Sequence, residues 1–424
     1  MRQKDTYFHK IDWVAIGLYF ALVFVGWINI YAAVYDEQNA TSIFDYSINS
    51  GKQLIWIGTA VLLITLIMVA DYRLFQNLSL ILYIIFVIIL FLTPFIGKEI
   101  NGQRAWFELG IFRLQPAEFT KFATALALAK LMENPTFDLA KFGHQLKALG
   151  IIGLPVALIM LQPDTGTAMV YSSFFIMLYR EGMPQKYYLF ALSLIGLSIL
   201  TLLITNNWYL YGGLGAIVLL LILASKKTWK NFAGIFLLGI LMFAYTYSLD
   251  YVVEKLPSHQ QNRIMVLFDP DVDPLGVGWN VTQSKIAIGS GGLFGKGYLE
   301  GTQTKFDFVP EQHTDFIFCT LGEEFGWIGS LIMISLFVIF LLRLVFLAER
   351  QKTRFSRIYG YCVIGLLFFH FSINIAMTIG LFPVVGIPLP FFSYGGSSLW
   401  SFTILLFIFI KLDSHRIQIL GRSY

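Results

Sequence analysis

The sequence predicts an all-α membrane protein of about twelve transmembrane helices with one large loop on the outer side. Hydrophobic residues make up 57% of the chain and charged residues only 13%, about half the charged fraction of a typical soluble domain. Apolar runs recur along the chain, and most of them are long enough to cross the ~30 Å hydrocarbon core of a bilayer. One polar stretch, residues 263–315, interrupts this series.

The first apolar run is predicted to be a retained transmembrane helix. Residues 1–10 are polar and basic, and no small-residue cleavage site follows the run Trp13–Val34, so it does not have the pattern of a removed signal peptide. The further predicted spans are Gln53–Ala70, Leu78–Ile96, Ala117–Met132, Lys147–Leu161, Thr167–Tyr179, Tyr188–Ile204, Trp208–Ser225, Phe232–Leu249, Thr314–Phe346, Tyr359–Ile379 and Ser393–Ile410.

The number of runs and the positions of the charges predict the orientation. An even number of spans places both ends of the chain on one side, and lysine and arginine favour the cytoplasmic side. With a cytoplasmic N-terminus, most basic connections lie inside and the outer connection 35–51 is acidic. Residues 97–116 and the long polar stretch also carry basic residues, although they are predicted to lie outside. An anionic ligand at the outer leaflet would explain them; the alternative is solvation or pairing with nearby acids.

Polar residues within the apolar runs predict particular contacts. Glu118 and Lys121 are three residues apart near the start of a helix, so their side chains share a face and can pair. Asp164, where one run ends and the next begins, is predicted either to cap the following helix or to line a functional site. His370 and Asn374, one turn apart, are predicted to form an interhelical hydrogen bond rather than a pair of ligands.

Residues 382–398 predict irregular backbone at membrane depth, because prolines and glycines interrupt an apolar run there. Such backbone is tolerated only where it is buried in protein or lines a cavity. Cys319 and Cys362 both fall within apolar runs, so their positions indicate neither a disulfide framework nor a metal site.

The polar stretch 263–315 concentrates the groups that could carry out chemistry. Asp269, Asp271 and Asp273 lie within five residues, and His313 and Asp315 form a second polar corner after a glycine-dense run. A carboxylate held near a reacting hydroxyl can act as a general base. By composition alone, any of the three neighbouring aspartates could have this role.

Several motifs extend through nearly the whole chain: Gly102–Lys121, Gln162–Thr167, Asp273–Gly276, Gln283–Gly297, Pro310–Phe318 and Gly386–Ser398. Together they are similar to the motifs of the SEDS family (shape, elongation, division and sporulation proteins), which are polytopic peptidoglycan glycosyltransferases. Residues 287–290 and 301–303 look more like the RodA branch of this family than the FtsW branch.

The resemblance implies the polymerisation of lipid II, a disaccharide-pentapeptide carried on undecaprenyl diphosphate. A sugar hydroxyl of the acceptor attacks the anomeric carbon of the growing chain, and the lipid diphosphate leaves with inversion. The essential aspartate of the family maps onto Asp273, which is therefore the expected base. The residues expected to bind the substrate are Arg104, Glu118, Lys121, Asp164, Gln283, Lys285, His313 and Asp315.

Among these residues, Arg104, Lys121 and Lys285 are expected to hold the diphosphate. Glu118 would hold Lys121 in place, and Asp164 would orient the inner wall of the site. Magnesium or manganese could neutralise the leaving group, but the sequence has no metal-ligand spacing. The expected partners are a class B penicillin-binding protein, which is a transpeptidase, the elongation machinery and membrane lipid, and not nucleic acid.

The resemblance also predicts one SEDS membrane domain over residues 1–424, in the bacterial cytoplasmic (inner) membrane with both termini cytoplasmic. Its periplasmic loop, residues 250–313, would carry the catalytic motif. Residues 188–249 hold enough apolar sequence for two helices more than the ten usual in the family. Two alternatives remain at this point: a flippase that moves lipid II across the membrane, and a scaffold that only recruits the transpeptidase.

Overall fold

The computed structural model describes residues 11–36, 41–100, 103–110, 112–204, 207–226, 228–256, 258–268, 272–273, 276–306 and 308–416. Most of these residues are helical, as predicted. The chain forms two compact units, residues 1–183 with 280–424 and residues 184–279. Each unit is described by itself below. The prediction of one membrane domain over residues 1–424 stays a prediction.

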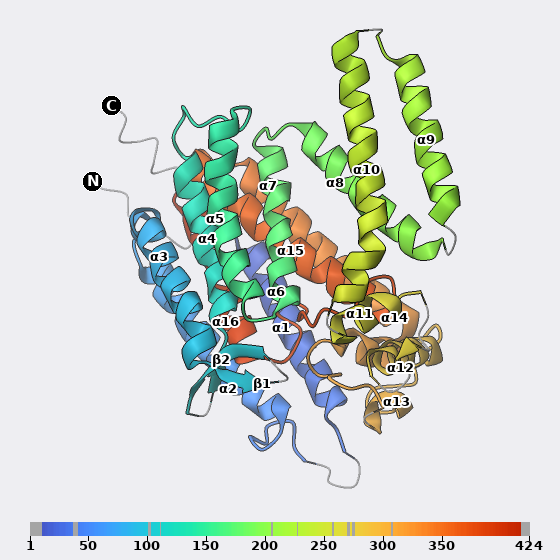
Figure 1. Ribbon diagram of the computed structural model, residues 1–424. Helices are drawn as coiled ribbons and strands as arrows, with labels where there is room; N and C mark the ends of the chain where they lie inside the picture. Colours follow the sequence, from blue (N-terminus) through green and yellow to red (C-terminus); the bar gives the residue numbers. More distant parts are fainter. Residues whose placement is uncertain are drawn as a thin grey trace, which may run out of the picture. The chain divides into compact units, whose positions relative to one another are not determined.

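The first unit is a bundle in which helices distant in sequence pack together. α2 packs on α16, α3 on α4, and α14 on both α1 and α15. α4, α15 and α16 are the most enclosed of its long helices, so the core of the bundle lies along them. The long helices (Figure 1) are α1 (Trp13–Ala33), α2 (Asn49–Val69), α3 (Tyr72–Ile96), α4 (Pro116–Met132), α5 (Phe142–Met160), α14 (Ile317–Glu349), α15 (Arg354–Thr378) and α16 (Gly396–Ser414).

The chain is a multi-pass membrane protein. In the described part of the chain, nine helices are long and apolar enough to cross a membrane, and one shorter apolar helix covers Trp208–Ala224. α4, which corresponds to the predicted span Ala117–Met132, is 17 residues long and is not counted among them. The predicted span Thr167–Tyr179 is divided into α6 (Thr165–Val170), a 3-10 turn (Tyr171–Ser173) and α7 (Phe174–Arg180). The total of about twelve spans stays a prediction.

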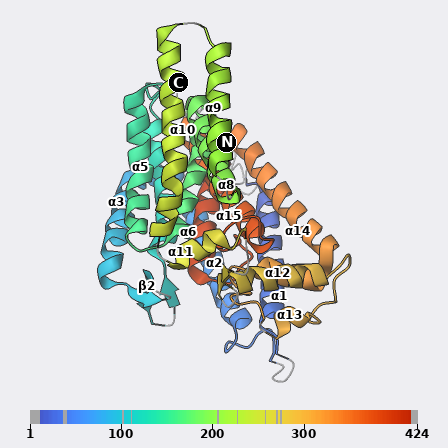
Figure 2. The same cartoon turned by 45° about the vertical axis from the view of Figure 1, so that its right-hand side comes forward.

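A small antiparallel sheet occupies the connection between α3 and α4, which was predicted only as a connection. Its strands, in the order β1-β2-β3, are β1 (Lys98–Ile100), β2 (Gln103–Leu109) and β3 (Phe112–Leu114). Glu108 lies opposite Arg113 across the β2–β3 pair, a cross-strand arrangement that favours opposite charges. Figures 1 and 2 show the sheet beyond the end of α3.

The connection between α15 and α16 is irregular and buried. This confirms the prediction for residues 382–395, whereas residues 396–398 begin α16. Residues 381–395 contain no helix or strand, and Val385, Ile387 and Phe392 are almost completely enclosed. Glycines on two helices let the backbone approach this segment. A Cβ atom on Gly166 of α6 would lie 2.1 Å from the Val385 carbonyl oxygen, and one on Gly26 of α1 would lie 2.6 Å from the Cα atom of Phe392.

The second unit contains the helices that were predicted between Tyr188 and Leu249. α8 (Gln185–Leu203) and α9 (Asn207–Ala224) both pack on α10 (Trp229–Lys255). α10 continues past the predicted start of the long loop at residue 250. The loop itself contains further helices, α11 (Ser258–Met265), α12 (Val277–Ser290) and α13 (Thr302–Lys305), of which α12 begins in this unit. That residues 188–249 add two helices to the family pattern stays a prediction.

The close approach at Gly26 predicts that Gly26→Ala destabilises the protein, because the new methyl group would overlap the backbone of Phe392. Overpacking of this kind costs about 1–3 kcal/mol. Gly17 in the same helix is the matched control, since a Cβ atom there meets nothing within 4 Å, and alanine stabilises a helix by about 0.5–1 kcal/mol relative to glycine. Thermal unfolding in detergent should give a lower Tm for Gly26→Ala only; equal Tm values for the two variants would contradict this packing.

Candidate active site

A buried ammonium group, that of Lys121, lies at the centre of the first unit. The Lys121 side chain is only 2% exposed, and its Nζ atom donates to Oε1 of Glu118 at 2.7 Å. The predicted pair therefore forms, with Glu118 itself 5% exposed. The ammonium group also lies 4.9 Å from the centre of the Phe402 ring in α16, where the face of the ring attracts a cation.

His370 of α15 provides the third contact of Lys121. Its Nδ1 atom lies 3.2 Å from the carbonyl oxygen of Pro388, and since a carbonyl can only accept, Nδ1 carries the proton. The Nε2 atom is then free to accept from Lys121 Nζ at 3.0 Å. This confirms the predicted interhelical hydrogen bond of His370: its partner, Lys121, lies on α4. Asn374 has a separate role, donating to the carbonyl oxygens of Asp315 and Ile387 at 2.8 Å each.

Asp164 is the N-cap of α6, which is one of the two roles predicted for it. Its carboxylate accepts from the Thr167 amide at 3.0 Å and from the Thr167 hydroxyl at 2.7 Å. It also accepts from the Gln115 side chain at 2.9 Å, and Gln115 directly precedes α4. Asp164 therefore connects the start of α6 to the start of α4, the helix that carries Glu118 and Lys121.

Arg104 lies on β2 at the surface of the first unit. It pairs with Glu99 at 3.0 Å, and both side chains are more than half exposed. The same two residues border a cavity of about 240 Å³ with Gln162 and Pro163, the residues that precede Asp164. Gln103 fixes the strand there by donating to the Pro163 carbonyl oxygen at 3.1 Å. Arg104 is thus positioned beside the Asp164 turn.

The other basic residues of this sheet pair with a nearby acid, which is one of the two explanations that the sequence offered for them. Lys98 and Arg113 both pair with Glu108, at 2.7 and 3.4 Å, and the hydrogen bond from Lys98 holds the pKa of Glu108 below its usual value. Exposed pairs of this kind contribute little to stability, because water and salt screen them. An anionic ligand can therefore compete for these cations, and the pairing does not exclude ligand binding.

His313 and Asp315 are held against the irregular segment between α15 and α16. The carbonyl oxygen of His313 accepts from the Tyr394 amide at 3.0 Å, and that of Asp315 accepts from Asn374. The carboxylate of Asp315 lies over Gly386, where a Cβ atom would be 3.4 Å from Oδ2. The Pro310–Phe318 and Gly386–Ser398 motifs are therefore brought together in space.

Gln283 and Lys285 lie on α12, in the part that belongs to the first unit. Between them, Ser284 donates to the carbonyl oxygen of Thr378 at 2.9 Å and fixes α12 to the end of α15. The aliphatic part of Lys285 lies against Gly380, just beyond that end. Lys285 is exposed, so its ammonium group is available to a ligand.

Asp273 stands just before α12 in the second unit. One carboxylate oxygen, Oδ2, accepts from the Val277 amide at 3.1 Å, so Asp273 caps the start of the helix. Gly276 makes room for this carboxylate, since a Cβ atom there would lie within 2.5–2.8 Å of it. Asp269 and Asp271, the two neighbours that composition did not distinguish from Asp273, lie outside the described residues. That Asp273 faces Arg104 and Lys121 stays a prediction, since these residues belong to different units.

The described residues do not supply a side-chain site for a divalent cation. Nowhere among them do three or more histidine, cysteine, aspartate or glutamate side chains come together in a way that could hold a metal. The magnesium or manganese expected at the leaving group is therefore not assigned to any residue of the described chain, and no step below depends on it.

Sequence analysis missed three residues that complete this site. Gln115 lies inside the Gly102–Lys121 motif, three residues before Glu118, and this position was a usable signal. Ser401 lies three residues after the Gly386–Ser398 motif. Its hydroxyl donates to Oε2 of Glu118 at 3.1 Å. Phe402 gave no signal, because an aromatic residue in an apolar helix is ordinary core.

The buried pair predicts that Lys121→Ala lowers stability strongly, because it leaves the Glu118 carboxylate buried without a cation. Removing one partner of a buried pair costs about 3–5 kcal/mol. Lys130→Ala is the matched control: Lys130 pairs with Glu133 at the same spacing in the same helix, but is 35% exposed, so its loss should cost about 0–1 kcal/mol. Denaturant unfolding in detergent measures both, and equal losses would contradict the burial described above.

Comparison with known proteins identifies the family. The FtsW/RodA/SpoVE model, described as cell cycle protein, matches residues 12–212 and 210–418. Peptidoglycan glycosyltransferase RodA of Treponema pallidum is 32% identical over 434 residues, which cover 96% of this chain and 98% of the relative. Peptidoglycan glycosyltransferase MrdB of Escherichia coli K12 is 36% identical over 351 residues, covering 83% and 81%. A chain from a solved peptidoglycan synthase complex, described as coordinating polymerization and crosslinking, has a TM-score of 0.69 at 27% identity, covering 96% of this chain and 99% of its own. The chain belongs to the FtsW/RodA/SpoVE family, as its motifs predict.

Proposed function

We propose that this protein is a peptidoglycan glycosyltransferase that polymerises lipid II into glycan strands for cell elongation and rod shape. The observation that carries the proposal is similarity along nearly the full chain to RodA and MrdB, both named peptidoglycan glycosyltransferases. The Asp273–Gly276 motif supports it locally, because Gly276 leaves the space that the Asp273 carboxylate occupies.

In the proposed reaction, Asp273 takes the proton of the acceptor's sugar hydroxyl. The hydroxyl oxygen forms a bond to the anomeric carbon of the growing chain, and the bond from that carbon to the lipid diphosphate breaks with inversion. Asp273 uses one carboxylate oxygen to cap α12, and among the described residues no cation lies within 4 Å of the carboxylate. Such a carboxylate keeps a lone pair for the proton.

The cations of the first unit are proposed to stabilise the leaving diphosphate in two ways. Arg104 and Lys285 are exposed and can contact its oxygens directly. Lys121 is enclosed by Glu118, His370 and Phe402, so it contributes a fixed positive charge behind the surface. Asp164, Gln283, His313 and Asp315 are proposed to line the same substrate site.

We propose that the chain lies in the bacterial cytoplasmic membrane with both termini in the cytoplasm and the catalytic loop outside. One cavity is lined both by Ile11, before α1, and by His415, after α16, which supports placing both ends on one side. Arg343, Arg350 and Arg416 lie at the same end, as expected for a cytoplasmic face. The proposed partner is a class B penicillin-binding protein; the synthase complex that resembles this chain coordinates polymerization with crosslinking.

The main prediction is that Asp273→Ala abolishes polymerisation of lipid II by the chain co-purified with its transpeptidase partner. Loss of a general base lowers the rate by about 10²- to 10⁴-fold. Asp269→Ala is the control, since it removes a neighbouring carboxylate of the same stretch and should retain most activity. The measurement is gel separation of glycan polymer formed from labelled lipid II.

The same variants distinguish the alternatives. Transfer of lipid II across vesicles without any polymer would indicate a flippase. Normal cell shape in an Asp273→Ala strain would indicate a scaffold. Either result would overturn the proposed reaction, as would polymer formation by Asp273→Ala at the rate of the unaltered protein.

A second prediction concerns Arg104, which is expected to bind the diphosphate. Arg104→Gln should lower kcat/KM about tenfold or more, because a hydrogen bond to a charged group is lost. Arg113→Gln removes an equally exposed arginine of the same sheet and should have a much smaller effect. Steady-state kinetics at low and moderate salt tests both variants; equal losses would show that the sheet attracts the substrate only through its net charge.

A further inference from the structure

A second cavity lies at the end of the first unit where α1 begins and α16 ends. Its volume is about 810 Å³, within the range of ligand-binding clefts. The start of α1, the end of α2, the start of α3 and the end of α16 surround it. None of the residues expected to bind substrate or act in catalysis lines it.

Most of the residues that line this cavity are apolar, and some of them are exposed on the outside of the bundle. Its apolar lining includes Ile16 and Phe20 of α1 and Ile64 and Met68 of α2. Phe20 is 39% exposed and Val69, at the end of α2, is 81% exposed. In a multi-pass membrane protein such exposed apolar side chains face lipid, so the cavity is open to the acyl region of the bilayer.

Basic side chains line the polar end of the cavity. Lys411 of α16 is 5% exposed and donates to the carbonyl oxygen of Met68 at 2.6 Å, while Arg73, at the start of α3, is exposed. His415 packs against the ring of Tyr72. Among the described residues, Asp71 is the only acid in the lining, and its carboxylate accepts from the Arg73 amide as the N-cap of α3.

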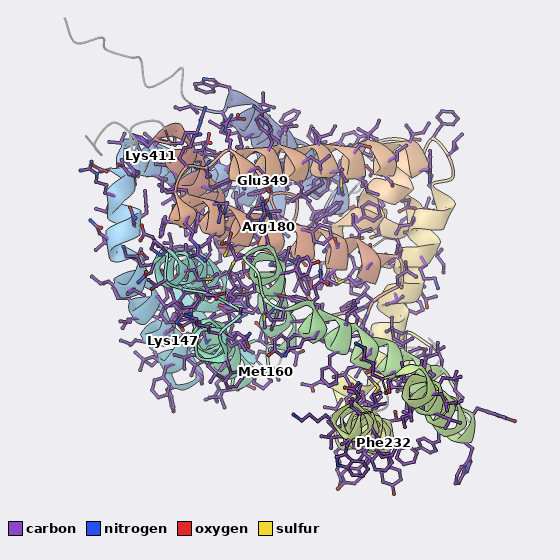
Figure 3. The ribbon with its side chains drawn as sticks, turned by 90° about the horizontal axis from the view of Figure 1, so that it is seen from above. Lys147, Met160, Arg180, Phe232, Glu349 and Lys411 are labelled. Atoms are coloured by element: carbon purple, nitrogen blue, oxygen red, sulfur yellow. The ribbon has the colours of Figure 1, made fainter. Side chains whose placement is uncertain are left out.

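The two cations that line this cavity differ in their ion pairing from the arginines at the same end of the unit. Arg343, Arg350 and Arg416 all pair with Asp12 or Asp413, and Arg180 pairs with Glu349, as can be followed in Figure 3. Within the described part of the chain, neither Lys411 nor Arg73 has a carboxylate oxygen within 4 Å of its charged nitrogens. The positive charge over the cavity is therefore left for an external anion.

We propose that this cavity binds one anionic phospholipid. Its phosphate would lie against Arg73 and Lys411, and an acyl chain would extend along Ile16, Phe20 and Ile64. Basic pockets between transmembrane helices recognise anionic headgroups in this way. A soluble anion would not account for the outward-facing apolar wall, so charge and apolar surface together select a lipid. The proposal does not depend on glycosyl transfer, and its test requires no activity.

The test is native mass spectrometry of the full chain in detergent, with dioleoyl phosphatidylglycerol or dioleoyl phosphatidylcholine added. Phosphatidylglycerol should remain bound and phosphatidylcholine should not. Arg73→Gln should weaken phosphatidylglycerol binding about fivefold, the contribution of one basic residue near an anionic lipid surface. Arg73 is exposed and forms no ion pair in the described chain, so the variant should fold normally.

Lys147→Gln is the matched control. It removes one positive charge from an exposed residue of α5 that does not line the cavity and lies well apart from Lys411 in Figure 3. Its phosphatidylglycerol binding should equal that of the unaltered protein. The proposal is overturned if both lipids bind equally, which would indicate a groove that takes any lipid, or if Arg73→Gln and Lys147→Gln bind phosphatidylglycerol equally well.

Discussion

The first unit depends on satisfying the buried charge of Lys121. Burying an ammonium group costs several kcal/mol unless opposite charge and hydrogen bonds surround it. Glu118 lies one turn away on the same helix, but His370 and Phe402 must come from α15 and α16. The requirement therefore fixes how α4, α15 and α16 pack. Apolar residues would fill the same space at least as stably, which is why we attribute the charge to function.

The irregular segment between α15 and α16 follows from the same arrangement. The tautomer that lets His370 accept from Lys121 has its other nitrogen donating to Pro388, and Asn374, one turn later, donates to Ile387. One face of α15 thus supports both the buried cation and the backbone of the segment. Asn374 also holds Asp315. The buried polar cluster and the Pro310–Phe318 motif are therefore parts of one connected structure.

Local contacts of the site could be predicted from the sequence, whereas long-range ones could not. The Glu118–Lys121 pair and the Asp164 cap involve residues three positions apart, where helix geometry alone brings the groups together. The contact of Lys121 with His370 depends on packing between helices far apart in sequence. The sheet at residues 98–114 was missed because its strands are short and lie within a polar connection. Composition could not choose the proposed base among Asp269, Asp271 and Asp273, and the resemblance to the family motif was needed to choose Asp273.

The central proposal is that Asp273 and Arg104 act on the same substrate, and cross-linking tests this proposal most directly. Asp273→Cys with Arg104→Cys would be treated with short bifunctional reagents, in a chain whose two native cysteines, both buried, are replaced by alanine. Lys98→Cys with Glu108→Cys, whose charged groups lie 2.7 Å apart in the unaltered chain, provides the positive control. The account predicts efficient cross-linking of positions 273 and 104 when lipid II is present. No cross-link between them, while the control pair reacts fully, would contradict it.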